Sequence, residues 1–191
     1  KLRRCIMYEN LVERKISREQ IYDGKVLRVV CDTVALPNGE ESKREFCLHI
    51  GAVCVIPVDE QGNVIMIKQF RYPFSEVLLE IPAGKLEKGE DPLEAGKREL
   101  EEECGIVADK VISLGEIYPT VAYCSEIIRM YAATGLHKTN QHLDEDEFLD
   151  VITMDLDEEP VIIYSIYRDT DAKYVLFTTK NGLIKKTTLE E

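Results

Sequence analysis

The alternation of hydrophobic and polar residues predicts β-strands along most of the chain. Residues 21–36 alternate loosely, and the turn sequence Pro37-Asn38-Gly39-Glu40 leads into residues 42–50, so a β-hairpin is expected there. Residues 52–58 form a short apolar run typical of a buried strand, and residues 64–70 form another after a Gln-Gly-Asn turn. Further strands are expected at residues 111–117, 127–133 and 148–154.

One segment, residues 91–104, carries the pattern of a helix. Asp91 is suited to the N-cap, Pro92 to the first helical position, and Glu94 completes a capping box. Gly105 follows where a left-handed residue commonly ends a helix. One firm helix among many strands predicts an α+β domain that begins with an antiparallel β-hairpin region.

This helix is predicted to have an apolar face and an acidic face. At about 100° of rotation per residue, one narrow stripe, expected to be buried, holds Leu93, Leu100 and Cys104. The adjoining arc holds Glu99, Glu102 and Glu103. Clustered like charges are unfavourable for a helix, whereas converging oxygen ligands are what Mg²⁺ or Mn²⁺ requires. The acidic arc is therefore a candidate metal site, and a merely solvated glutamate-rich face is the alternative.

Composition and charge narrow the function classes. The 191 residues are 45% hydrophobic and 31% charged, which is typical of a soluble globular protein of one domain or of one domain with an appendage. The 24 Lys and Arg against 36 Asp and Glu give a net charge of −12, which argues against nucleic acid or an anionic membrane as partner. A phosphorylated substrate stays compatible, because bound divalent cations invert the local charge.

No feature of the sequence predicts secretion or membrane insertion. No run approaches the roughly 18 apolar residues of a membrane span, and the charged residues 1–5 do not begin a signal peptide. The six cysteines include no Cys-x-x-Cys pair, so they are expected to be reduced packing residues. A cytoplasmic enzyme is the resulting expectation.

The helix lies within a longer motif with specific spacing. From Gly84 to Ile106 the chain reads Gly-x5-Glu-x7-Arg-Glu-Leu-x-Glu-Glu-x-Gly-Ile. This resembles the signature of the Nudix hydrolases, with every specified position filled. The resemblance implies a mixed β-sheet sandwiched between helices, and hydrolysis of a nucleoside diphosphate linked to another moiety.

The resemblance also implies roles for individual residues. Glu99 and Glu103 would bind Mg²⁺, or alternatively Mn²⁺, with Glu102 as a ligand or a support and the Ala83 carbonyl completing the site. Arg98 and Glu90 would form an ion pair that steers these carboxylates. Gly84 and Gly105 would serve the conformation of the backbone.

Flanking segments resemble the ADP-ribose pyrophosphatase subfamily, over roughly residues 8–157; they are residues 68–73, 79–85, 118–120, 123–126 and 144–147. This implies cleavage of ADP-ribose to AMP and ribose 5-phosphate by a homodimer that exchanges N-terminal strands. The substrate would be bound by Arg71, Glu80 and Glu126, although a surface ion pair is the alternative for the first two.

Two points stay open within this resemblance. The subfamily carries Ser-Pro-Gly where this chain has residues 120–122, Thr-Val-Ala, so GDP-mannose, UDP-glucose or a related nucleoside diphosphate sugar is an alternative substrate. A non-catalytic ligand sensor is a further alternative. The general base would come from the acidic loop, where Glu145 matches best and Glu147 second, unless that loop is merely solvated.

The chain is predicted to divide into three parts: residues 1–50 for dimerisation and substrate, residues 51–159 as the hydrolase core, and residues 160–191 as a β-hairpin tail. The tail is β-branched and aromatic at residues 160–167, and residues 174–187 read as two strands around an Asn-Gly turn. It resembles a blade fragment from the C-terminal region of type II topoisomerase A subunits. A DNA-associated module is disfavoured by the net charge, and the tail is assigned no function.

Overall fold

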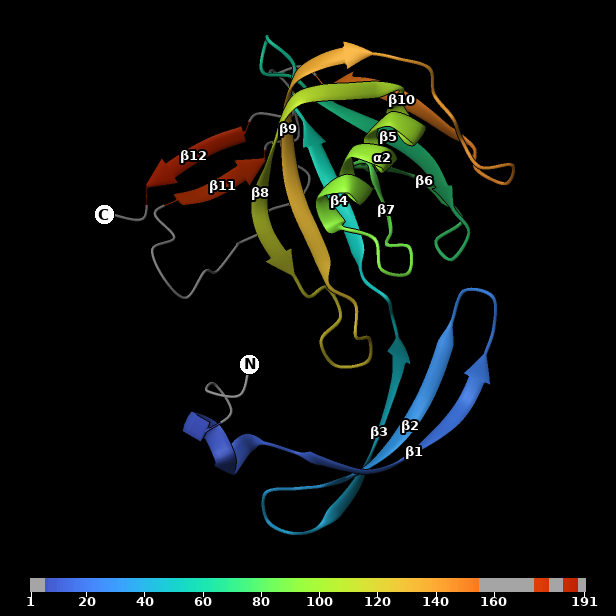
Figure 1. Cartoon of the computed structure of the whole chain (residues 1–191), viewed down its shortest axis with the longest axis vertical. Coiled ribbons are helices and arrows are strands. Elements are labelled where there is room, and N and C mark those ends of the chain that lie inside the picture. The colour runs from blue at the N-terminus through green and yellow to red at the C-terminus, as the bar shows by residue number, and fades with distance from the viewer. Residues whose placement is uncertain (1–5, 155–173, 179–183, 189–191) are drawn as a thin grey trace. The chain divides into compact units, whose positions relative to one another are not determined.

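The computed structural model describes residues 6–154, 174–178 and 184–188, and its contacts divide the chain into two units (Figure 1). The N-terminal unit comprises residues 1–51 and 118–127. The larger unit comprises residues 52–117 and 128–191. The hydrophobic pattern does not indicate that residues 118–127 belong with the N-terminal strands. They join these strands through hydrogen bonds between residues that are far apart in the sequence.

The N-terminal unit is a three-stranded antiparallel sheet in the order β1-β2-β3, preceded by a short 3₁₀-helix. The elements are η1 (Ile6–Leu11), β1 (Arg14–Asp23), β2 (Arg28–Ala35) and β3 (Glu41–Leu48). The expected hairpin at residues 37–40 is confirmed, since Ala35 pairs with Glu41. The expectation of one strand over residues 21–36 is wrong, because the Gly24 N–H donates to the Leu27 carbonyl (2.8 Å) and a turn separates β1 from β2.

Besides the two-stranded sheet of the tail, the larger unit contains two sheets among its described residues, in the orders β7-β4-β9-β8 and β10-β5-β6. The first is mixed, because β4 and β9 run parallel while its other pairs are antiparallel. Its strands are β4 (Ala52–Pro57), β7 (Ala83–Lys85), β8 (Ile106–Ile117) and β9 (Ile128–Lys138). The second consists of β5 (Val64–Arg71), β6 (Glu76–Glu80) and β10 (Leu149–Met154).

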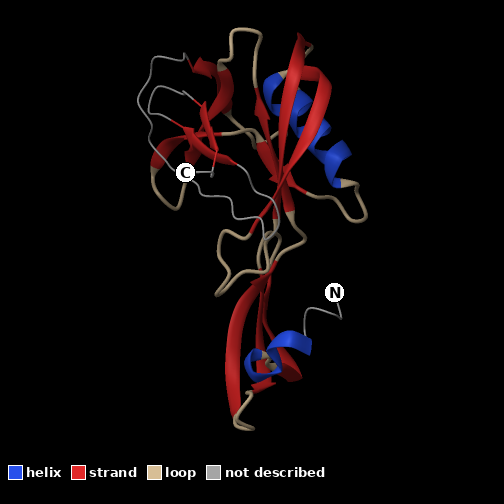
Figure 2. Cartoon of the chain, turned by 90° about the vertical axis from the view of Figure 1, so that its left-hand side faces the viewer, coloured by secondary structure: helices blue, strands red, loops and turns tan. Residues whose placement is uncertain are grey.

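Helix α2 (Pro92–Cys104) packs on strands β4 and β8, and its neighbours form the core of this unit. The buried cluster combines residues of β4, β5, β8, β9 and α2: Val53, Val55, Ile65, Ala95, Leu100, Ile106, Tyr131 and Ala133. Strands far outnumber helices in the described residues, as Figure 2 shows, and the fold class is α+β as predicted. The implied second helical layer is not found in the part of the chain that the structure describes.

The helix ends are largely as predicted. The Asp91 side chain accepts hydrogen bonds from the N–H groups of Leu93 (2.9 Å) and Glu94 (3.2 Å), and Gly105 ends the helix in the left-handed conformation (φ 60°, ψ 42°). The capping box is not completed, because the Glu94 carboxylate accepts from Lys97 Nζ (2.7 Å) instead of turning back to the N-cap.

The buried face of α2 differs from the predicted stripe. Leu100 is fully buried as expected, but Leu93 and Cys104 are only partly buried against the core. Small residues bring the helix close to the sheet instead: a Cβ on Gly96 would lie 3.3 Å from the side chains of Tyr131 and Val55. As a result the helix turns its acidic arc inward as well.

The tail forms two strands, as predicted. Strand β11 (Tyr174–Thr178) pairs antiparallel with β12 (Ile184–Thr188). The Asn-Gly turn between them and the predicted strand at residues 160–167 lie outside the described residues. Among the residues that are described, no helix is long and apolar enough to cross a membrane.

Candidate active site

The centre of the site is a buried carboxylate, Glu103, in the last turn of α2. Its residue is only 3% exposed, and its Oε2 accepts a hydrogen bond from the Ala83 N–H (2.9 Å). Burial, with smaller contributions from the charges of Glu147 and Glu99, raises the pKa of Glu103 to about 8, although the hydrogen bond from Ala83 acts in the opposite direction. A buried carboxylate without a cationic partner is costly, so this position is poised to receive positive charge.

Glu99 lies one turn earlier on the same face of the helix. Burial raises the pKa of its carboxyl. Arg98, whose Nη1 lies 3.0 Å from Glu99 Oε1, partly offsets this rise. A Cβ on Gly84 would lie 2.0 Å from Glu99 Oε1, so no other residue leaves room for this carboxylate. Gly84 was predicted to serve the backbone, but it lacks a positive φ and serves the packing of Glu99 instead.

Arg98 organises the opposite edge of the acidic arc. Its Nε and Nη2 donate to the two oxygens of Glu90 (2.8 and 3.1 Å), and its Nη1 donates to Glu102 Oε2 (2.7 Å). The guanidinium lowers the pKa of the Glu90 carboxyl. The implied ion pair between Arg98 and Glu90 is therefore present, and the same guanidinium pairs with Glu102 and Glu99, whereas Glu103 has no ion pair with any residue that the structure describes.

The acidic loop contributes Glu147 more directly than Glu145. Gln69 Nε2 on β5 donates to Glu147 Oε1 (3.4 Å), and the charge of Glu147 raises the pKa of both Glu99 and Glu103. Glu145 is exposed, and its side chain makes no hydrogen bond or ion pair with any residue that the structure describes. The structure thus brings the second-ranked candidate to the carboxylates and leaves the first-ranked one in solvent.

The two predicted substrate residues of β5 and β6 bind each other. Arg71 Nε and Nη2 donate to the two oxygens of Glu80 (2.7 and 2.5 Å), the surface ion pair that the sequence left as an alternative. Glu80 is the first cause of the raised pKa of Arg71, and the charges of Glu103 and Glu147 add to it. Arg71 therefore lies within electrostatic reach of the candidate metal ligands.

Glu126 belongs to the N-terminal unit. Its Oε1 is 3.7 Å from His49 Nε2, and the His49 N–H donates to Ser125 Oγ (2.9 Å). These contacts fix residues 125 and 126 beside the end of β3. The predicted substrate role of Glu126 stays a prediction.

The carboxylates fit a divalent cation by their chemistry. The described residues contain no group of three His, Cys, Asp or Glu side chains already arranged as metal ligands. They do contain the buried Glu103 and the half-buried Glu99, whose carboxyl pKa values are raised by burial and by the charge of Glu147. Hard oxygen donors that repel one another are drawn together by Mg²⁺ or a similar ion, which replaces the bound protons.

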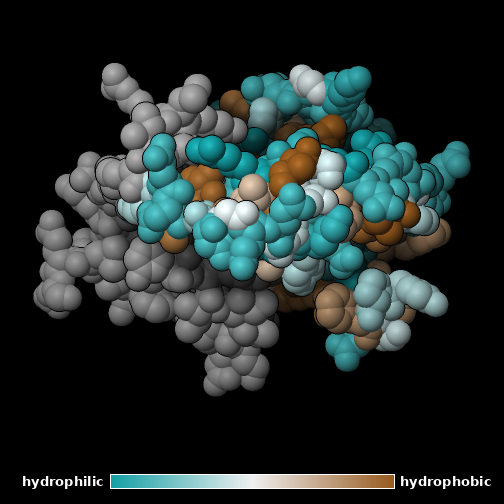
Figure 3. All heavy atoms as spheres, turned by 90° about the horizontal axis from the view of Figure 1, so that it is seen from below, coloured by the Kyte–Doolittle hydropathy of each residue, from teal (hydrophilic) through white to brown (hydrophobic). Residues whose placement is uncertain are grey.

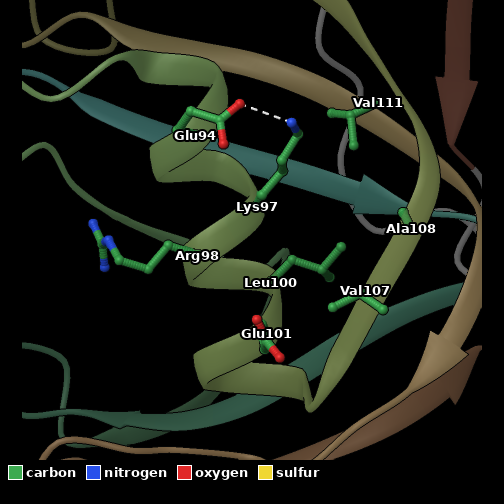
Figure 4. Close-up of a pocket in the computed structure, with 8 residues that line it drawn as sticks. All are labelled: Glu94, Lys97, Arg98, Leu100, Glu101, Val107, Ala108 and Val111. Atoms are coloured by element: carbon green, nitrogen blue, oxygen red, sulfur yellow. Dashed lines mark hydrogen bonds and ion pairs between the residues drawn. The ribbon is translucent and has the colours of Figure 1, made fainter.

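A separate cavity of about 330 Å³ lies on another face of α2 (Figure 4). Leu100 and Val107 line it, and the Glu94–Lys97 ion pair crosses its rim. On the helix this face is turned away from Glu99 and Glu103. The cavity is therefore not part of the candidate metal site.

Comparison with known proteins identifies the family. A family model described as the NUDIX domain matches residues 48–174. The chain belongs to the NUDIX family. The ADP-ribose pyrophosphatase of Bacillus subtilis (strain 168) is 42% identical to it over 159 residues, 82% of this chain and 86% of the relative. The methanol dehydrogenase activator of Bacillus methanolicus is 45% identical over 148 residues, 76% of this chain and 80% of the relative.

A solved structure confirms the fold of this NUDIX protein. The crystal structure of an ADP compounds hydrolase has a TM-score of 0.68 and 23% sequence identity, and the match covers 75% of this chain and 78% of that chain. The predicted family, fold class and enzyme class are thereby confirmed: the chain is a Nudix pyrophosphatase that uses a divalent cation.

Two residues near the site were not predicted from the sequence. Gln69 contacts Glu147, and Gln141 donates from Nε2 to the Glu103 carbonyl (2.5 Å). An isolated glutamine carries no motif or periodicity, so only the placement of strand β5 and of the acidic loop reveals either role.

Proposed function

We propose that this protein hydrolyses the pyrophosphate bond of ADP-ribose to AMP and ribose 5-phosphate. The observation that carries the proposal is the buried carboxylate of Glu103, which has no ion pair with any described residue and lies beside the half-buried Glu99 on the same helix. The kinship with a protein named ADP-ribose pyrophosphatase supports the substrate. A pyrophosphate is strongly anionic, so its charge must be neutralised before a nucleophile approaches, and this site is built to hold the ion that does so.

We propose Mg²⁺ as the ion, with Mn²⁺ as the alternative. Glu99, Glu103 and the carbonyl of Ala83 would hold it, while Glu102 supports the site through Arg98. The bound ion supplies charge neutralisation of the diphosphate and activation of water. Arg98 stays charged, so its hydrogen bonds hold the carboxylates of Glu90 and Glu102 in place.

For the general base we propose Glu147 first and Glu145 second. The base accepts a proton from the attacking water as its oxygen bonds to phosphorus and the bridging P–O bond breaks. It must therefore lie within hydrogen-bond reach of that water. This order is supported by the contact of Glu147 with Gln69 and by its charge, which raises the pKa of both Glu99 and Glu103.

Substrate contacts would come from Arg71, Glu80 and Glu126. Arg71 presents a planar guanidinium that pairs with phosphate or ribose oxygens, and Glu80 accepts hydrogen bonds from hydroxyl or amine groups. In the structure these two side chains form an ion pair with each other. We propose that substrate exchanges this ion pair for contacts with its own polar groups, so that both residues are kept oriented until it binds.

A homodimer is proposed from the surface of the N-terminal unit. Strand β1 is exposed along its entire length and carries exposed Ile16, Ile21 and Tyr22. Apolar side chains also interrupt the hydrophilic face seen in Figure 3. An exposed strand with apolar residues is a ready site for pairing with a second copy. The cytoplasmic location stays a prediction.

The alternatives are a related nucleoside diphosphate sugar and a ligand sensor. The first is kept by the Thr-Val-Ala sequence at residues 120–122, where ADP-ribose pyrophosphatases carry Ser-Pro-Gly. The second is disfavoured because every carboxylate of the motif is present. The relative named methanol dehydrogenase activator supports a second candidate function, the activation of a partner dehydrogenase, at 45% identity.

The test is product analysis after incubation with ADP-ribose and Mg²⁺. We expect AMP and ribose 5-phosphate, faster than any product from GDP-mannose or UDP-glucose under the same conditions. Faster turnover of one of the other two sugars would reassign the substrate. Saturable ADP-ribose binding without products would favour the sensor.

A further inference from the structure

The C-terminal end of α2 is capped by a segment that is distant in the sequence. The last four carbonyls of a helix have no partner inside it. Here the Gly105 N–H reaches the Glu101 carbonyl (2.8 Å), but the next two carbonyls are bonded from residues beyond β9. The His142 N–H donates to the Glu102 carbonyl (2.9 Å), and Gln141 Nε2 donates to the Glu103 carbonyl (2.5 Å).

The backbone around Gly105 is shaped for this contact. The Thr139 N–H donates to the Gly105 carbonyl (2.7 Å), which extends the β8–β9 ladder by one bond. A Cβ on Gly105 would lie 2.9 Å from the Gln141 nitrogen and 3.1 Å from the Thr139 carbonyl oxygen. Gly105 therefore does more than permit a left-handed cap: it leaves room for residues 139–141 to cross the end of the helix.

The same segment leads directly into the acidic loop. Glu147 follows His142 by five residues, and Leu149 then begins β10 opposite Gln69. The loop is thus held at one end by the helix and at the other by the sheet. Between these anchors the Glu147 N–H donates to the Asp144 carbonyl (3.0 Å), a turn that directs the glutamate.

We propose that Gln141 is a positioning residue, which fixes the acidic loop and its Glu147 against the end of the helix that carries Glu99 and Glu103. It is the one side chain in this cap, since the other two bonds come from backbone N–H groups. Gln141 is itself exposed, so its side chain adds little to the core, and the contact serves the loop. The inference rests on the proposed role of Glu147 in hydrolysis.

Three substitutions test the donor that Gln141 supplies. Gln141→Ala removes it, and we expect kcat for ADP-ribose to fall about tenfold or more, because small misplacements of a reacting group are costly. Gln141→Glu cannot donate and meets the negative end of the helix dipole, so its kcat falls further. Gln141→Lys restores a donor suited to a helix C-terminus and recovers most of kcat. KM stays within about twofold in all three, because a misplaced base slows the chemical step more than it weakens substrate binding.

A double-mutant cycle separates positioning from general stabilisation. If Gln141 acts through Glu147, Gln141→Ala changes kcat little in a Glu147→Gln background, so the two losses are not additive. The matched control is Gln61→Ala, which removes an exposed glutamine from the turn before β5. Additive losses in the cycle, or an unchanged kcat in Gln141→Ala, would overturn the inference.

Hydrogen exchange tests the contact without relying on turnover. We expect the amides of His142 and Glu147 to be protected in the unaltered chain and to exchange at least tenfold faster in Gln141→Ala, as locally opened amides do. Unaltered protection overturns the positioning role. If the unaltered chain fails to hydrolyse ADP-ribose while exchange responds as expected, the proposed function fails and the structural cap stands.

Discussion

Glu99 and Glu103 differ from the other glutamates of α2 in their surroundings, not in their chemistry. Glu102 binds Arg98, and Glu94 binds Lys97, so each has a cation beside it. Glu103 is buried, Glu99 is half-buried with Arg98 at 3.0 Å, and burial is the largest cause of the raised pKa of each carboxyl. Desolvation, rather than the lack of a nearby cation alone, distinguishes these two proposed metal ligands.

The raised pKa of Glu103 predicts an unusual pH dependence of stability in the metal-free protein. A carboxyl whose folded-state pKa lies above its unfolded value stabilises the fold at low pH and loses that contribution as the pH rises through the folded pKa. With values of 4.5 and about 8, the free energy of unfolding should decline from pH 5 to pH 9 in EDTA. Urea titrations across this range measure it.

The control for this prediction is Glu103→Gln, which cannot ionise. We expect a distinctly smaller decline between pH 5 and pH 9 in that variant, and a smaller decline in the unaltered chain once Mg²⁺ is added. An equal slope in both proteins would show that Glu103 does not titrate in this range.

Gly84→Ala is predicted to damage catalysis more than folding. The new Cβ would meet the Glu99 carboxylate at 2.0 Å, and this side chain rather than the backbone would move. We expect kcat to fall by about a hundredfold, as for loss of a metal ligand or of its immediate support. Steady-state kinetics together with the melting temperature measure the two effects.

Lys85→Ala, the neighbouring exposed position on β7, is the matched control for Gly84→Ala. It should leave kcat unchanged. Full activity in Gly84→Ala would mean that Glu99 does not need its observed position.

At this scale the motif made the clustering of Glu99 and Glu103, the proposed metal ligands, and the ion pair of Arg98 predictable, because its spacing is specific. The sequence could not reveal which glutamate of the acidic loop approaches them. Glu145 and Glu147 have the same chemistry and neighbouring positions, and only the pairing of β10 with β5 decides that Glu147 reaches Gln69. The role of Gly84 was hidden for a similar reason, since its neighbour in space is Glu99.

Among the secondary-structure elements, α2 has the most defined ends. Asp91→Ala removes the acceptor for two backbone N–H groups and should lower the free energy of unfolding by about 1 kcal/mol. Asp91→Ser should retain most of it, because serine also caps helices. Urea denaturation of the three proteins measures the difference, and equal values for alanine and serine would contradict the capping role.

Most elements could be predicted from periodicity and turn residues, and the exceptions have physical causes. The break between β1 and β2 was missed because Val26 and Leu27 continue the apolar pattern through the turn. The buried face of α2 was misjudged because Gly96, which periodicity ignores, sets how closely the helix approaches the sheet. Close packing of small residues is a tertiary property.

For the molecule as a whole, the two units contain different features. The larger unit contains every described contact among the motif carboxylates. The N-terminal unit gathers residues 118–127 beside β3 and leaves β1 exposed. Hydrogen bonds such as that from the Cys47 N–H to the Tyr123 carbonyl (2.8 Å) join segments that lie far apart in the chain. No local sequence pattern predicts such a bond.

The exposed β1 surface predicts self-association. Sedimentation equilibrium should give about twice the 21.8 kDa mass of one chain. Replacing Ile16 and Ile21 by Glu should shift the population to monomer, because like charges and lost apolar area oppose pairing. Glu19→Gln on the same strand is the control, and it should leave the mass unchanged. A monomer in the unaltered protein would contradict the proposed dimer.

Metal binding itself is the most direct test of the account. Titration of the metal-free protein with Mn²⁺, followed by the electron paramagnetic resonance signal of the free ion, counts bound ions without requiring turnover. We predict saturable binding that weakens about tenfold to a hundredfold in Glu99→Gln and in Glu103→Gln, and that is unchanged in the half-buried control Glu101→Gln. Equal affinity in all four proteins would show that Glu99 and Glu103 do not hold the cation.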